Sequence, residues 1–267
     1  MKKKRKTLWD RFTSGYLMLV LLFIYLPIAY VVLFSFNESK SLSNFTGFSL
    51  RWYENMLEDR TMLESIQTTV LVAVIATLVS TFVGTLTAIG LSKSRRIIRS
   101  LVLEINNLPV MNPDIVTAIG MMLLFISVKM QLSLLTLILS HITFCIPYVI
   151  LSIMPKLRQL DDNVAEAALD LGATPRQALT KVLLPQIYPA ILSGALIAFS
   201  MSFDDFVISF FTAGVGINNI SMYVYSMKRY NPSVNALSTL IVVVVTLILV
   251  LVNVLPSNRG KQKEEEV

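Results

Sequence analysis

Six long apolar runs constrain this chain more than any other feature of its sequence. Each is close to the roughly 20 residues that a helix needs to cross the hydrocarbon core of a bilayer. Because lipid offers no partner to an unpaired backbone N–H or C=O group, such runs fold as helices. The predicted spans are Tyr16–Phe36, Ile66–Leu91, Leu108–Val128, Leu132–Met154, Ala190–Thr212 and Leu237–Leu255. Composition agrees, since 15% of the 267 residues are charged, against about 25% in soluble domains.

The runs predict an all-α integral membrane protein with one transmembrane domain. We expect a basic amino-terminal segment (1–15), six helices within 16–255 and a polar tail (256–267). The start, MKKKRK before an apolar run, is similar to a signal peptide, but the run is long and no small-residue cleavage site follows, so we expect an uncleaved first span. In the segment 37–65, FSLRWYENML predicts a short amphipathic helix at the surface. No internal repeat is evident, which disfavours a secondary transporter built from inverted repeats.

The basic residues are distributed unevenly between the two sides of the predicted spans. Of 23 Lys and Arg residues, 17 lie in the two ends and in the loops on the same side, and six lie on the other side. Loops rich in Lys and Arg stay on the cytoplasmic side of a membrane. We therefore expect a multi-pass protein of the bacterial cell membrane with both termini in the cytoplasm. This topology accounts for the net charge of +6, so no nucleic-acid partner is expected. The chain has one His and one Cys, too few for a His/Cys metal site, and we expect neither a metal nor a cofactor.

The loop between the fourth and fifth predicted spans, 155–189, has the pattern of two short helices. Apolar residues recur at helical spacing at Val164, Ala167, Ala168 and Leu171. Asp162 or Asn163 is suited to cap the first helix. Gly172 stands where a helix end favours a residue with positive φ, and Thr174 followed by Pro175 restarts the chain as a cap and a first helical residue. Pro185 and Pro189 are expected to end the second helix before the membrane.

The stretch EAALDLGATPRQALTKVLLP in this loop resembles the EAA loop of permease subunits in binding-protein-dependent ABC importers. The residues that carry the resemblance are Glu166, Ala167, Ala168, Gly172, Val182, Leu184 and Pro185, with Val182 where the family usually has Ile. The resemblance implies that the bent helical pair, with Asp170 on its first helix, is a coupling element that seats in a separate ATPase subunit. The chain has no G-x-x-x-x-G-K-[ST] phosphate loop, so we expect it to be non-catalytic and a partner to hydrolyse ATP.

A wider resemblance covers nearly the whole chain. The segments that carry it, in order, are NFTGFSLRWYENML, MNPDIVTAIGMMLLF, SHITFCIPYVI, EAALDLGA, SFDDFVISFF and YSMKRYNPSVNALST. Together they are similar to the permease subunits of spermidine/putrescine ABC importers, which belong to the MetI-like permeases. The resemblance implies a six-helix MetI-like fold in membrane lipid, paired with a second homologous permease subunit, an ATPase subunit dimer and an extracellular polyamine-binding protein. The implied cargo is a small polyamine cation.

Two adjacent aspartates interrupt the fifth predicted span. An ionised carboxylate in hydrocarbon costs several kcal/mol unless something compensates it. Polyamines carry ammonium groups separated by methylenes, and carboxylates beside aromatic faces suit both parts. The candidate pathway residues here are Asp204, Asp205, Phe203, Phe206, Tyr223 and Tyr225. Residue types alone do not distinguish which aspartate faces the pathway, nor whether the helix continues or unwinds there. The alternative is that the pair marks a helix end or a structural hydrogen bond.

Two further polar residues lie within or beside the apolar runs. In MNPDIV, Asn112 is expected to cap a helix with Pro113 at its first position, and Asp114 suits the helix N-terminus and is a weaker pathway candidate. His141 is expected to be buried, hydrogen-bonded and engaged in helix packing. Two other functions stay open at this point. One is an importer of the same type for iron, sulfate or a sugar phosphate, and the other is a transporter or channel driven by an ion gradient.

Overall fold

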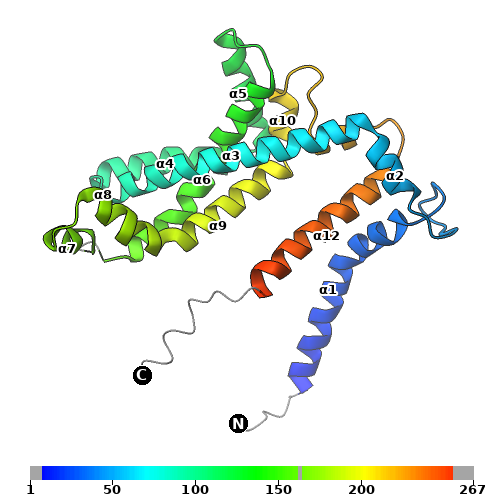
Figure 1. The fold of residues 1–267 in the computed structure, drawn as a ribbon, viewed down its shortest axis with the longest axis horizontal. Coiled ribbons are helices and arrows are strands. Elements are labelled where there is room, and N and C mark those ends of the chain that lie inside the picture. The colour runs from blue at the N-terminus through cyan, green and yellow to red at the C-terminus, as the bar shows by residue number, and fades with distance from the viewer. Residues whose placement is uncertain (1–7, 162–163, 255–267) are drawn as a thin grey trace. The chain divides into compact units, whose positions relative to one another are not determined.

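The computed structural model describes residues 8–161 and 164–254, and within them the chain is nearly all helical (Figure 1). In the described residues the one strand-like pairing is a bridge between Asn37 and Phe48. The elements are α1 (Leu8–Ser35), α2 (Arg51–Glu58), α3 (Arg60–Ser92), α4 (Arg96–Met111), α5 (Asp114–Ser127), α6 (Leu134–Gln159), α7 (Val164–Asp170), α8 (Pro175–Gln177), the π-helical η1 (Ala178–Leu183), α9 (Leu184–Phe203), α10 (Val207–Thr212), α11 (Ile220–Ser226) and α12 (Ser233–Val254). The cap predicted at Asp162 or Asn163 and the predicted tail 256–267 lie outside the described residues.

The chain divides into two compact units, residues 61–226 and a unit made from both ends of the chain. In the unit made from the ends, α1 packs against α12, and α12 packs against α2. The amphipathic helix predicted around FSLRWYENML is confirmed as α2, with Trp52 and Met56 buried. The Trp52 Nε1–H donates to the Asn37 carbonyl at 2.6 Å. Along α1 most apolar side chains are exposed, which is typical of a helix that faces lipid.

In the unit of residues 61–226, α3 and α9 approach α6 closely around Val149. A Cβ added to Gly84 of α3 would lie 2.7 Å from Val149 Cγ1, and one added to Gly194 of α9 would lie 3.3 Å from the Val149 Cα. Glycine at these two positions therefore lets three helix backbones come together, as small residues do in membrane helix packing. The Cys145 thiol donates to the Ala198 carbonyl at 3.5 Å and joins α6 to α9 at the same core.

Four described helices are long and apolar enough to cross a bilayer, at Thr13–Ser35, Arg60–Ser92, Leu134–Gln159 and Pro175–Phe203. The pair α4 and α5 makes a fifth if it counts as one span, although the two helices are bent by 106°. Among the described residues α12 adds a shorter apolar stretch, Ser233–Leu247. The count of six spans therefore stays a prediction.

The third predicted run, Leu108–Val128, is divided between α4 and α5, with the new helix beginning close to the cap expected at Asn112. The chain is extended at Asn112 and Pro113, because a residue that precedes proline avoids helical backbone angles. The predicted cap is shifted by one residue. The Pro113 carbonyl accepts from Val116 N–H at 2.9 Å, so Pro113 is the cap of α5 and Asp114 is its first residue.

The expectation that Pro185 and Pro189 end the second loop helix is wrong. Helix runs without a break from Pro175 through η1 and α9 to Phe203. The Leu184 N–H donates to the Leu179 carbonyl, five residues earlier, as in a π turn. The Gln186 side chain donates to the Val182 carbonyl at 2.9 Å. This local change of hydrogen bonding lets the helix continue past Pro185, which has no N–H to give.

Candidate functional site

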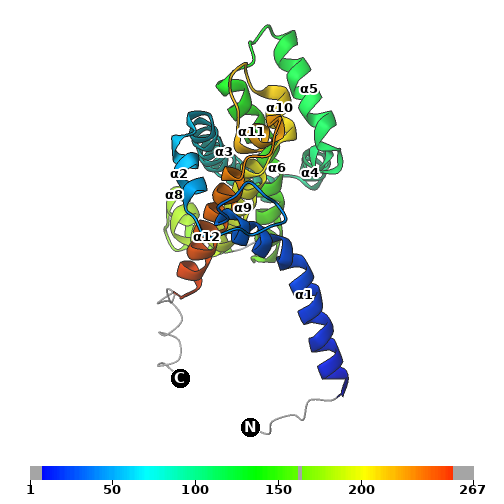
Figure 2. The same ribbon diagram turned by 90° about the vertical axis from the view of Figure 1, so that its right-hand side faces the viewer.

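The fifth predicted span unwinds at the two aspartates. Helix α9 ends at Phe203, α10 begins at Val207, and residues 204–206 connect them. The predicted continuous run to Thr212 is therefore interrupted, which answers one of the two questions that residue types left open. Because the backbone is irregular here, Asp204 and Asp205 lie in different surroundings. Figure 2 shows the short helices α10 and α11 that follow the break.

The Asp205 carboxylate is buried and fully engaged by the protein. Its side chain is 6% exposed. Oδ2 accepts from the Ser209 backbone N–H at 2.8 Å and from the Ser209 hydroxyl at 2.9 Å, while Oδ1 accepts from Ile208 N–H at 3.2 Å. These bonds satisfy free N–H groups in the first turn of α10, as an N-terminal cap does. The charge-assisted bonds compensate the desolvation of Asp205.

His141 connects this cap to α6. One ring nitrogen, Nδ1, is 2.7 Å from the Ser202 hydroxyl near the end of α9, and Nε2 is 3.0 Å from the Ser209 hydroxyl in α10. Nε2 also lies 3.5 Å from Asp205 Oδ2. The side chain is buried, so the prediction of a hydrogen-bonded histidine that packs helices is confirmed. The ring therefore bridges both sides of the break in the span.

Asn219 completes the same network from the other side. Its Nδ2 donates to the Asp205 carbonyl at 2.7 Å and to the Ser209 hydroxyl at 2.8 Å. Its Oδ1 accepts from Met222 N–H at 2.8 Å and so caps α11. Sequence reasoning missed Asn219 and Ser209. The available signal was the Asn-Asn pair directly before the apolar start of α11, since asparagine is a preferred cap.

The Asp204 carboxylate is exposed, in contrast to that of its neighbour. The Ser221 hydroxyl donates to the Asp204 backbone carbonyl at 3.3 Å. Within residues 8–161 and 164–254, no other residue donates a hydrogen bond to its side-chain oxygens, and no cation pairs with them. Of the two aspartates, Asp204 is thus the one whose charge is available to a ligand.

An aromatic cluster includes Phe206, which follows Asp204 by two residues. The ring centroids of Phe206 and Tyr225 are 4.7 Å apart, and Phe210 lies 5.4 Å from Phe206 and 6.2 Å from Tyr225. Tyr225 is 70% exposed, so its ring and hydroxyl are accessible. The structure therefore brings the Phe206 and Tyr225 rings together, and Phe206 is two residues from Asp204 along the chain; aromatic faces combined with a carboxylate suit an organic cation.

The other predicted pathway residues lie elsewhere. Phe203 stacks on Phe199 within α9, with ring centroids 5.5 Å apart. Tyr223 faces inward and is 9% exposed. Asp114 is exposed at the start of α5, and among the described residues it makes no hydrogen bond or ion pair with residues 203–206. The roles predicted for these three residues gain no support from the geometry and stay predictions.

The loop that carries the EAA-like stretch forms a bent pair of helices, as predicted. Gly172 has φ +88° between α7 and α8, a backbone conformation that favours glycine. The Ala173 N–H donates to the Ala168 carbonyl at 3.0 Å and closes the end of α7. Thr174 caps α8, because its hydroxyl accepts from Gln177 N–H at 3.3 Å while its own N–H donates to Gln177 Oε1 at 2.8 Å.

The residues of this bent pair divide into an exposed tip and a packed back. We call the segment Val164–Gln177 the knob. At its tip Leu171 is 89% exposed, and Glu166, Ala167 and Asp170 on α7 are exposed too. Behind the tip, Ala168, Val182 and Leu184 are half-buried, Leu184 packs against the helical core, and Pro185 is exposed. An apolar tip with two carboxylates beside it is suited to dock into a partner.

Comparison with known proteins places the chain in a family. Residues 80–257 match the model of the binding-protein-dependent transport system inner membrane component. The chain belongs to this family. It is 35% identical over 260 residues to the putrescine transport system permease protein PotI of Escherichia coli, with 94% of this chain and 92% of that protein covered. It is 35% identical over 240 residues to the spermidine/putrescine transport system permease protein PotC of Haemophilus influenzae, with 89% and 93% covered.

One solved structure supports the fold independently. A chain of a bacterial ABC transporter involved in the import of the acidic polysaccharide alginate superposes with a TM-score of 0.73 over 95% of this chain and 97% of that one. At 16% identity this likeness concerns the fold alone. The predicted all-α permease fold is confirmed. By its family, the chain is a membrane component of a binding-protein-dependent transport system. Membership implies a partner ATPase and a substrate-binding protein.

Proposed function

We propose that this chain is the transmembrane permease subunit of an ATP-driven importer of polyamines such as spermidine and putrescine. The observation that carries the cargo assignment is 35% identity, over about nine-tenths of the chain, to permeases named for these two solutes. The fold does not carry it, because the solved relative belongs to a transporter of an acidic polysaccharide.

The geometry around residue 204 is consistent with a cationic cargo. The Asp204 carboxylate is exposed, and the paired Phe206 and Tyr225 rings belong to the segments that follow it, with Phe206 two residues away along the chain. An ammonium group pairs with the carboxylate, and the methylenes and the next ammonium group lie against the aromatic faces. Asp205 has a different role in this proposal. Its carboxylate accepts hydrogen bonds from Ser209 and Ile208, so it stabilises the start of α10 after the break and does not bind cargo.

Coupling to ATP follows from the continuous helix that joins the knob to the break. The 29 residues from Pro175 to Phe203 form one helical stretch, which begins in the knob and ends directly before Asp204. In the proposed complex, two ATPase subunits grip the knobs of this chain and of a second, homologous permease. Closure of the ATPases moves the helix as a rigid rod and changes the surroundings of Asp204. An outer polyamine-binding protein delivers the cargo, and both termini of this chain are cytoplasmic.

A competition assay tests the cargo assignment. The complete complex, with its binding protein, is reconstituted in liposomes, and uptake of labelled spermidine is measured against excess unlabelled solutes. We expect spermidine and putrescine to compete, and ferric iron, sulfate and a sugar phosphate to have no effect. Competition by one of the latter three alone, with no effect of either polyamine, would assign the importer to another solute.

A further inference from the structure

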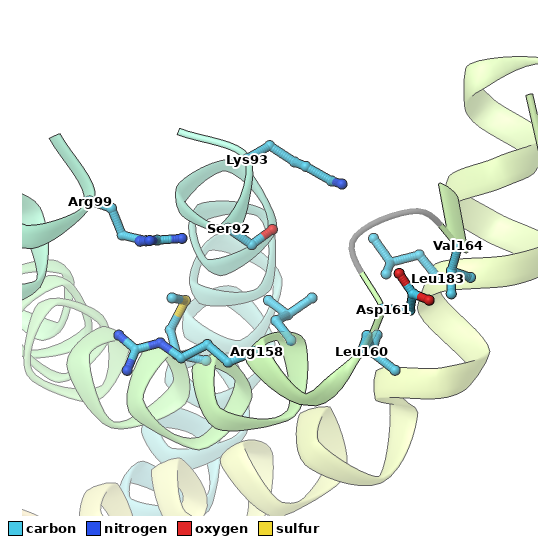
Figure 3. A pocket seen from close by; sticks show the side chains of 10 residues that line it. Ser92, Lys93, Arg99, Arg158, Leu160, Asp161, Val164 and Leu183 are labelled. Atoms are coloured by element: carbon cyan, nitrogen blue, oxygen red, sulfur yellow. The ribbon is translucent and has the colours of Figure 1, made fainter. Parts of the chain in front are cut away.

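A basic hollow lies where the start of α4 faces the end of α6. Its volume is about 560 Å³, and it is lined by Arg96, Arg99, Ser100, Leu103, Glu104 and Arg158. A smaller cavity of about 50 Å³ shares Arg99 and Arg158 with it and extends to Ser92, at the end of α3. Figure 3 shows the Arg99 and Arg158 side chains from α4 and α6 beside this smaller cavity.

The charges around the hollow are unbalanced. Its lining contains three arginines and one acidic residue, Glu104. In the part of the chain that the structure describes, no ion pair reaches Arg96, Arg99 or Arg158. Arginines that gather without carboxylate partners favour phosphate, because the planar guanidinium binds two phosphate oxygens at once. The hollow therefore has the charge and the donors for a phosphate group.

An apolar surface begins at the same place. None of the α4 residues is buried. Ile97, Leu101 and Ile105 follow each other at intervals of four residues, so they share one face of α4, and all three are exposed. A soluble phosphate gains nothing from this face. A phospholipid uses both features, since its headgroup binds the arginines while its acyl chains cover the apolar face.

We propose that the hollow binds the phosphate group of an anionic phospholipid, with the acyl chains along the Ile97–Leu101–Ile105 face of α4. The hollow lies on the side that the distribution of basic residues assigns to the cytoplasm, where basic pockets between helices bind anionic headgroups. A bound headgroup holds the start of α4 against the end of α6, next to the knob. The proposal does not depend on the identity of the cargo.

Thermal unfolding of the purified full-length chain in detergent tests the site. The chain is titrated with short-chain phosphatidylglycerol, with phosphatidylcholine of the same chain length, and with inorganic phosphate. We expect phosphatidylglycerol to raise the melting temperature with saturation, and the other two probes to act much more weakly. In the double variant Arg99→Gln/Arg158→Gln the midpoint of the phosphatidylglycerol titration is expected to rise about fivefold per guanidinium removed, on the order of 25-fold in all.

Arg95→Gln is the matched control, because Arg95 is an exposed cation next to Arg96 that does not line the hollow. Its midpoint is expected to stay within about twofold of the parent. An equal loss in the control would reduce the effect to general surface charge and overturn the proposal. Equal stabilisation by inorganic phosphate would assign the site to a soluble anion, and equal stabilisation by phosphatidylcholine would exclude charge recognition. If the double Gln variant does not fold, Arg99→Lys/Arg158→Lys, which keeps both charges, is expected to bind phosphatidylglycerol within about fivefold of the parent, and total loss there contradicts the proposal.

Discussion

The same substitution, Asp to Asn, is predicted to have different effects at positions 204 and 205. Asp205→Asn keeps the shape of the side chain but replaces one carboxylate oxygen by an NH₂ group. In the structure Oδ1 faces the Ile208 N–H at 3.2 Å, and Oδ2 faces the Ser209 N–H and hydroxyl at 2.8 and 2.9 Å. Whichever way the asparagine amide is turned, its NH₂ group faces the backbone N–H of either Ile208 or Ser209, and two donors then oppose each other. Asp204→Asn disturbs no hydrogen bond that another described residue makes to that side chain.

The magnitudes follow from these contacts. A buried donor left without an acceptor costs about 1–3 kcal/mol. For a chain of this size, about 2 kcal/mol lowers the melting temperature by roughly 4–8 °C. We therefore expect Asp205→Asn to lower the melting temperature by roughly 4–8 °C. We also expect it to lower the yield of the assembled complex. Asp204→Asn, an exposed substitution, is expected to stay within about 0.5 kcal/mol of the parent. Asp204→Asn is instead expected to reduce uptake of the cargo, because the carboxylate that pairs with an ammonium group is lost.

The assay measures both quantities on the same preparations. Melting temperature is recorded on purified complex, and spermidine uptake is measured in liposomes at equal amounts of complex. Asp204→Asn is expected to reduce uptake at least about tenfold at an unchanged melting temperature, and Asp204→Glu, which keeps the charge, is expected to recover part of the uptake. Full uptake by Asp204→Asn in a complex of normal stability would remove Asp204 from the mechanism. A melting temperature of Asp205→Asn equal to the parent would refute the capping role of Asp205.

Three further substitutions probe the knob and the helix core. Gly172→Ala forces alanine into φ +88°, at a cost of about 1–2 kcal/mol, and is expected to lower the uptake obtained per ATP hydrolysed, measured in the reconstituted complex. Leu171→Asp changes an exposed tip, so the melting temperature is expected to stay constant while the amount of ATPase that co-purifies falls at least about tenfold; undiminished co-purification would exclude the tip from docking. Gly84→Ala places a Cβ 2.7 Å from Val149 Cγ1 and is expected to cost about 1–3 kcal/mol, whereas Gly90→Ala in the same helix meets no atom within 4 Å and is expected to be neutral or stabilising by thermal unfolding.

Much of the fold follows from the sequence because lipid leaves a chain few options. Apolar runs of sufficient length become helices, and α1, α3, α6 and α9 each overlap a predicted run over most of their length. The knob was predictable for a different reason. Positive φ at Gly172 and the cap at Thr174 are local properties, fixed by residues close in sequence.

The errors come from interactions that residue types do not reveal. Hydropathy runs smoothly through Asp204, so it does not reveal that the backbone breaks there, whereas at Asn112 and Pro113 the residue types did predict the start of a new helix. At Pro185 the local rule predicts a break, yet a π turn and the Gln186 side chain let the helix continue. The two aspartates were indistinguishable in sequence, because their difference depends on Ser209, Asn219 and His141, and His141 is more than sixty residues away along the chain.

Uptake measured with and without the ATPase tests the central claim most directly. Labelled spermidine is offered to liposomes that contain this chain alone, or the complete complex with its binding protein, each with and without ATP on the side of the ATPase. The account predicts uptake by the complete complex with ATP, and none by the chain alone under any condition. Spermidine uptake by the isolated chain, driven by an ion gradient and without ATP, would contradict it.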